Sequence, residues 1–132
     1  MSTSEAFYRR MFFVGALWNL LGGVIILLAT DWIFATAGLA PPAPALYYQA
    51  WVALFMTFGL GYYFVAREPY SNRPIVVLGI IGKLAFAGVF LYHMIASPGQ
   101  VPRLFLVPVV GDLVFVVLFG MFLNFARKAV GA

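Results

Sequence analysis

The chain has 132 residues, of which 64% are hydrophobic and only 9% are charged, whereas a soluble domain carries about 25% charged residues. This composition, with a mean hydropathy of +1.01, excludes an ordinary soluble protein and predicts that any function lies in or beside a membrane. Despite a net charge of +4, the basic residues are too scattered to bind nucleic acid, and the absence of cysteine excludes thiol chemistry.

Four apolar stretches are long enough to cross a bilayer. A helix rises about 1.5 Å per residue, so about 20 residues span a hydrocarbon core about 30 Å thick. We therefore expect an all-α integral membrane protein, a four-helix bundle that forms a single transmembrane domain over residues 1–132. The expected spans cover residues 7–29, 47–66, 75–96 and 105–126.

Polar residues and prolines separate these spans. Thr30 and Asp31 end the first, and three prolines between residues 41 and 44 cannot continue a helix, because proline lacks the amide donor. We expect residues 32–39 to lie at the membrane interface. Two further polar turns, at residues 67–74 and 97–103, precede the third and fourth spans.

The basic residues predict the orientation, because Lys and Arg in short loops are retained on the cytoplasmic side. On the opposite side, Arg103 is the only basic residue that lies in a loop. The basic residues expected at the cytoplasmic surface are Arg9, Arg10, Arg67, Arg73, Arg127 and Lys128. Both termini and the middle loop should therefore be cytoplasmic, in a multi-pass protein of the bacterial cell (inner) membrane.

The beginning of the chain also has features of a secretory signal peptide. Arg9 and Arg10 precede an apolar run, and residues 35–37 mimic a cleavage site. However, the run exceeds the roughly 7 to 15 residues of a signal core. We therefore expect a permanent first span.

Lys83, Asp112 and Asn19 are the leading candidates for an intramembrane polar site. A charge at the bilayer centre costs at least about 2.5 to 3.5 kcal/mol, so Lys83 and Asp112 each require an explanation. Counting from the span midpoints separates them by roughly 9 Å along the membrane normal. This estimate is compatible with a direct Lys83–Asp112 pair and with a pair bridged by Asn19. The two charged residues could form a structural ion pair or line a polar cavity.

Thr57, Gln49 and His93 are secondary polar candidates. A single histidine cannot supply a usual zinc or haem ligand set, so we expect neither a metal nor another cofactor. Catalytic residues are not expected either, because no acid, base and nucleophile occur at a suggestive spacing.

Small residues at four-residue spacing predict where the helices approach one another. Gly79 and Ala87 lie one turn to either side of Lys83, on its helix face. A second strip is expected in the second span, at Ala53, Thr57 and Gly61. The strip expected in the first span contains Gly15, Asn19 and Gly22 or Gly23.

The four-span plan, together with Arg10, Gly15 and Gly22 in the first span, resembles the DoxX-like group of small four-helix bacterial membrane proteins. The chain departs from that group because it lacks a lysine soon after the first-span glycines and carries Lys83 in the third span. The resemblance implies an accessory membrane subunit, in some members linked to quinol oxidation, and it supplies no catalytic residues.

Three functions are compatible with these features. The leading hypothesis is a non-catalytic bundle that associates with itself or with a larger membrane complex, with the lipid bilayer as its surroundings. A second is a small ion- or proton-coupled transporter or channel that uses Lys83 and Asp112. A third is a membrane enzyme acting on a lipid or quinone, with Asp112 or His93 as acid and base.

Overall fold

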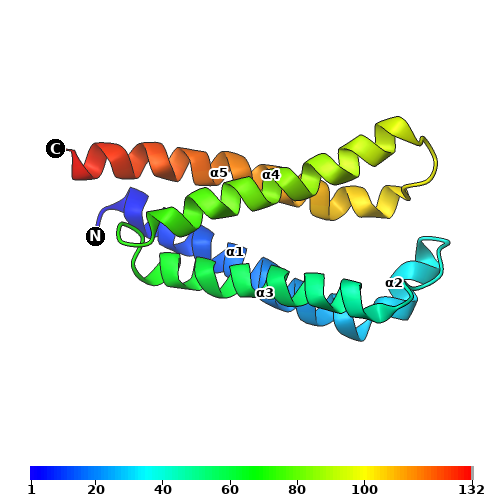
Figure 1. Ribbon diagram of the computed structural model, residues 1–132. Helices are drawn as coiled ribbons and strands as arrows, with labels where there is room; N and C mark the ends of the chain where they lie inside the picture. The colour runs from blue at the N-terminus through cyan, green and yellow to red at the C-terminus, as the bar shows by residue number, and fades with distance from the viewer. Residues whose placement is uncertain (132) are drawn as a thin grey trace. The chain divides into compact units, whose positions relative to one another are not determined.

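The structure is a computed structural model that describes residues 1–131. The elements are α1 (Thr3–Leu28), α2 (Thr30–Thr36), α3 (Ala45–Arg67), α4 (Arg73–Ala96), the 3₁₀ turn η1 (Arg103–Phe105) and α5 (Leu106–Val130) (Figure 1). No strand occurs within residues 1–131. Four helical segments are long and apolar enough to cross a membrane. The all-α class is therefore confirmed, and each expected span corresponds to one candidate membrane helix.

The helix ends differ from the expected span ends by at most four residues, and the largest differences are at the start of α1 and the end of α5. α1 begins at Thr3 because the Ser2 hydroxyl accepts a hydrogen bond from the Glu5 amide at 3.1 Å, which is an N-cap. α5 continues to Val130, with Arg127 and Lys128 in its last turn. Their positive charges are favourable there because the C-terminal end of a helix is the negative end of its dipole. Hydropathy marks the apolar stretch alone and does not detect these polar extensions.

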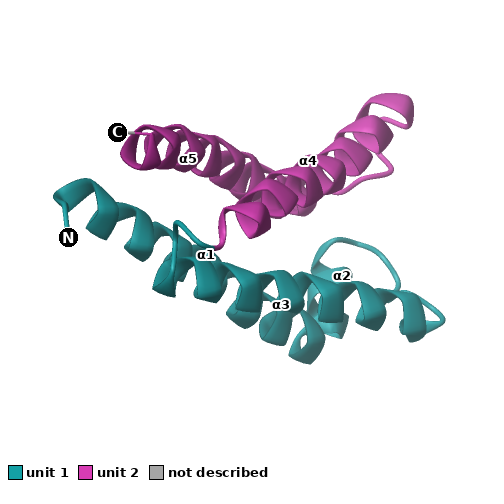
Figure 2. Ribbon diagram, turned by 60° about the vertical axis from the view of Figure 1, so that its left-hand side comes forward, with its two compact units in different colours: residues 1–71 teal, residues 72–132 magenta. Residues whose placement is uncertain are grey.

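The chain divides into two compact units (Figure 2). Unit 1 covers residues 1–71 and contains α1, α2 and α3, whereas unit 2 begins at Asn72 and contains α4, η1 and α5. Within each unit the two long helices pair as a hairpin. The single domain and the four-helix bundle expected from the sequence stay predictions.

In unit 1, α1 and α3 approach closely around Gly59. A Cβ atom at Gly59 would lie 2.9 Å from Asn19 Cβ and 3.2 Å from the Ala16 carbonyl oxygen. The buried α3 residues recur at helical spacing and are Val52, Gly59, Tyr62, Val65 and Ala66. The strip expected at Ala53, Thr57 and Gly61 does not form the contact with α1, because Ala53 and Thr57 are exposed. Gly59, not Gly61, allows the close approach.

α2 is a short helix in the segment expected at the membrane interface. It has no buried residue, and Trp32 is 69% exposed. The Phe34 ring contacts the Tyr48 ring edge-on, with centroids 5.6 Å apart. This contact attaches α2 to the first turn of α3.

In unit 2, α4 and α5 bury one stripe each. The buried residues of α4 are Val76, Gly79, Lys83 and Ala87. Those of α5 are Val109, Asp112, Phe115, Phe119, Phe122 and Ala126. The spacing of three and four residues matches one face of a helix. The expectation that Gly79 and Ala87 share the face of Lys83 is confirmed.

Candidate functional site

The two charged residues expected inside the membrane are paired directly. Lys83 Nζ, on α4, lies 2.6 Å from Asp112 Oδ1, on α5. Each residue is only 4% exposed. The opposite charges neutralise each other at close range, so the buried pair adds no net charge to the hairpin.

The helix register explains how this pair forms. Phe90 contacts Phe105, with ring centroids 5.9 Å apart. Seven residues separate Lys83 from Phe90, and seven separate Phe105 from Asp112, which is about two helical turns on both helices. The antiparallel hairpin therefore brings Lys83 level with Asp112. Of the two arrangements compatible with the sequence, the direct pair is the one observed.

An aromatic ring completes the surroundings of the Lys83 ammonium. Lys83 Nζ lies 5.2 Å from the centre of the Phe115 ring, within the range of a cation–π contact. Phe115 follows Asp112 by three residues, so both lie on one face of α5. The arrangement holds the ammonium between a carboxylate and an aromatic face. Chemically, it can fix the register of two helices or retain one proton between an amine and an acid.

Asn19 forms its hydrogen bond within unit 1. Its Nδ2 donates to the Phe55 carbonyl oxygen at 2.8 Å, and the residue is 2% exposed. Its Oδ1 is buried and has no hydrogen-bond partner in the described part of the chain. Asn19 therefore joins α1 to α3, and the direct Lys83–Asp112 contact requires no bridging residue.

The secondary polar candidates are exposed. The Thr57 hydroxyl donates to the Ala53 carbonyl oxygen at 2.9 Å, within its own helix. Gln49 and His93 are also exposed, and the His93 ring contacts Tyr92 with centroids 5.3 Å apart. Among residues 1–131, no group of three or more His, Cys, Asp or Glu side chains could hold a metal ion.

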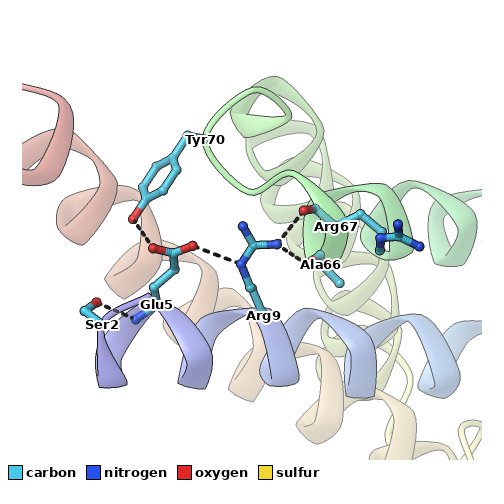
Figure 3. Close-up of polar contacts among 6 residues, drawn as sticks. All are labelled: Ser2, Glu5, Arg9, Ala66, Arg67 and Tyr70. Atoms are coloured by element: carbon cyan, nitrogen blue, oxygen red, sulfur yellow. Dashed lines mark hydrogen bonds and ion pairs between the residues drawn. The ribbon is translucent and has the colours of Figure 1, made fainter.

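A polar cluster that the sequence analysis missed connects the start of α1 to the end of α3 (Figure 3). Arg9 Nε lies 3.0 Å from Glu5 Oε1, one turn earlier in α1. The Arg9 guanidinium also donates to the carbonyl oxygen of Ala66 at 3.2 Å and to that of Arg67. Arg9 thus supplies donors to carbonyls in the last turn of α3, which lack helical partners.

Tyr70 connects this cluster to the loop that follows α3. Its hydroxyl donates to Glu5 Oε2 at 3.4 Å. Desolvation raises the pKa of Tyr70, and the nearby Glu5 carboxylate raises this pKa further. The sequence indicates only a topology signal at Arg9. The four-residue spacing between Glu5 and Arg9 was the available sign of a local ion pair.

No protein family, curated protein or solved structure matches this chain.

Proposed function

We propose that the protein is a non-catalytic, multi-pass membrane bundle that associates with itself or with a larger membrane complex. The closed Lys83–Asp112 pair is the observation that carries this proposal. Both groups are 4% exposed, and they lie 2.6 Å apart. In this state the carboxylate and the ammonium are engaged with each other, as in an ion pair that fixes helix register.

The extent of uncovered apolar surface supports association. In the most apolar stretch of each span, only 22 to 33% of residues are buried by the protein itself. Lipid or partner helices must cover the remainder. On α4 and α5, a Cβ atom at Gly88 or Gly120 would meet nothing within 4 Å. A neighbouring helix can approach closely at such small residues.

The proposed orientation places both termini and the middle loop in the cytoplasm, with the protein in the inner membrane of a bacterium. The excess of Lys and Arg at one set of helix ends supports this orientation. The resemblance to DoxX-like proteins supports an accessory role within a membrane complex. The positions of Arg10, Gly15 and Gly22 carry that resemblance.

The proposal is tested by the size of the particle in its native membrane. We expect blue-native electrophoresis, after mild detergent extraction, to show a species larger than one chain. Crosslinking in intact membranes before extraction should trap the same species. A protein that remains monomeric in both experiments, without a co-purifying partner, would contradict the proposal.

A small ion- or proton-coupled transporter is the second candidate, and the burial of Lys83 and Asp112 within candidate spans favours it. Ionisable residues inside membranes commonly mark proton or ion paths. Its test is flux into proteoliposomes, with the wild type compared with Asp112→Asn. A flux that depends on Asp112 would favour transport, and one unchanged by the substitution would exclude this mechanism.

A further inference from the structure

One buried hydrogen-bond acceptor in unit 1 is left without a donor. Asn19 Oδ1 has no partner within residues 1–131, although the residue is 2% exposed. The orientation of the side-chain amide is fixed by chemistry. Only Nδ2 can donate to the Phe55 carbonyl oxygen, 2.8 Å away, so the oxygen must be the remaining atom. Buried polar atoms are nearly always paired, with protein or with ordered water.

The surrounding backbone cannot supply the missing donor. Asn19 lies in the middle of α1, where the amide hydrogens are engaged in helical hydrogen bonds. Across the interface, α3 presents Gly59, where even a Cβ atom would lie 2.9 Å from Asn19 Cβ and from Leu20 Cγ, so this position offers no side-chain donor. A donor for Asn19 Oδ1 must therefore come from outside these two helix backbones.

We infer that Asn19 is a binding site for one neutral hydroxyl group, which donates a hydrogen bond to Oδ1 beside the α1–α3 contact. The group is neutral because the nearby side chains of Leu20, Phe55 and Met56 are apolar and offer no counter-charge. Its carrier is small, since a residue 2% exposed cannot be reached by the side chain of another protein. Water and a small apolar alcohol share this chemistry.

Solid-state NMR of the full chain in lipid vesicles distinguishes these carriers. Asparagine side chains are labelled with ¹³C, and magnetisation is transferred to them from water protons. The chain has three asparagines, so Asn72 and Asn124, which are not buried, provide positive controls. The negative control is the labelled methyl group of Met11, which is buried in the same unit at 6% exposure. Met11 lies nearer than Asn19 to Arg9 and to the beginning of α1, so general hydration would reach it first.

A bound water predicts transfer to Asn19 several-fold faster than transfer to Met11. A bound alcohol predicts slow transfer to both, together with a hydroxyl compound that is extracted from the wild type in about equal amount to the protein. In that case Asn19→Leu should lose the compound. Slow transfer to Asn19, together with the absence of any extracted hydroxyl compound, would overturn the inference. Both results are measured on the wild type, so this test does not depend on whether the Asn19→Leu variant folds.

Discussion

The ammonium of Lys83 lies 2.6 Å from a carboxylate oxygen of Asp112, although the two residues are 29 positions apart in the chain. Lys83 lies on α4 and Asp112 lies on α5, the two helices of one hairpin. The pair explains why two residues that are individually costly in a membrane occur in this chain. It also identifies α4 and α5 as helices whose stability depends on each other.

Removing one member of the pair should strongly destabilise the hairpin. Lys83→Leu leaves Asp112 as a buried charge without its partner, and breaking such a pair costs about 3 to 5 kcal/mol. We expect this loss in the free energy of unfolding, measured by steric trapping in bicelles. The matched control is Lys128→Leu at an exposed position, for which we expect little change.

Replacing both members should restore most of the lost stability. Lys83→Leu combined with Asp112→Leu removes both charges, and apolar replacements of buried pairs are often neutral or stabilising. We expect the free energy of unfolding of the double variant to lie within about 1 kcal/mol of the wild-type value. The double variant should also form a species of the same size as the wild type in blue-native electrophoresis. A double variant as unstable as the single variant would show that the pair is not simply a neutralised structural contact.

The candidate site was only partly predictable from sequence. Lys83 and Asp112 could be recognised because charge in an apolar span is rare, but their contact could not be deduced from the span midpoints. Those midpoints assumed that both helices are centred at the same depth. However, α5 extends to Val130, beyond the expected end of the fourth span, so the midpoint of that span was misplaced. The contact between Phe90 and Phe105 shows the actual register of the two helices.

The helix faces illustrate a second limit of sequence reasoning. The prediction that Gly79 and Ala87 lie on the buried face of α4 is correct, because both are four residues from Lys83 and a charged residue in a span must be buried. The second span has no such marker, and spacing alone did not distinguish the Ala53–Thr57 strip from the face that contains Gly59. Small size shows that a close approach is allowed, but not which small residue is used.

Gly59 should be intolerant of a side chain. In Gly59→Ala the new methyl group would lie 2.9 Å from Asn19 Cβ and Leu20 Cγ. The helices must then separate, at a cost of about 1 to 3 kcal/mol in unfolding free energy. The control is Gly88→Ala, because a Cβ there meets nothing within 4 Å. Equal stability of the two variants would contradict the close contact of α1 with α3.

Arg9 should stabilise unit 1 more than its neighbour Arg10 does. Arg9→Gln removes donors from the Ala66 and Arg67 carbonyls and breaks the contact with Glu5. We expect a loss of about 1 kcal/mol, because the cluster is partly exposed. The exposed Arg10 provides the comparison, and Arg10→Gln should change the thermal midpoint much less than Arg9→Gln.

Tyr70 should ionise at a higher pH than an ordinary tyrosine. Desolvation and the Glu5 carboxylate favour the neutral phenol in the folded protein, so its pKa is raised. The associated stabilisation is present below the usual tyrosine pKa of about 10 and is lost as pH rises through the folded-state pKa. The ultraviolet titration difference between wild type and Tyr70→Phe measures this shift, and Glu5→Gln should reduce it without abolishing it.

The most direct test of the membrane account is the position of each loop relative to the bilayer. The chain has no cysteine, so single cysteines can be introduced at residues 4, 71 and 131 and at residues 40 and 100. We predict that a membrane-impermeant thiol reagent, added to intact cells, labels the cysteines at 40 and 100 and leaves the other three unlabelled until the membrane is opened. Labelling of residues 4 and 131 from opposite faces would contradict four crossings.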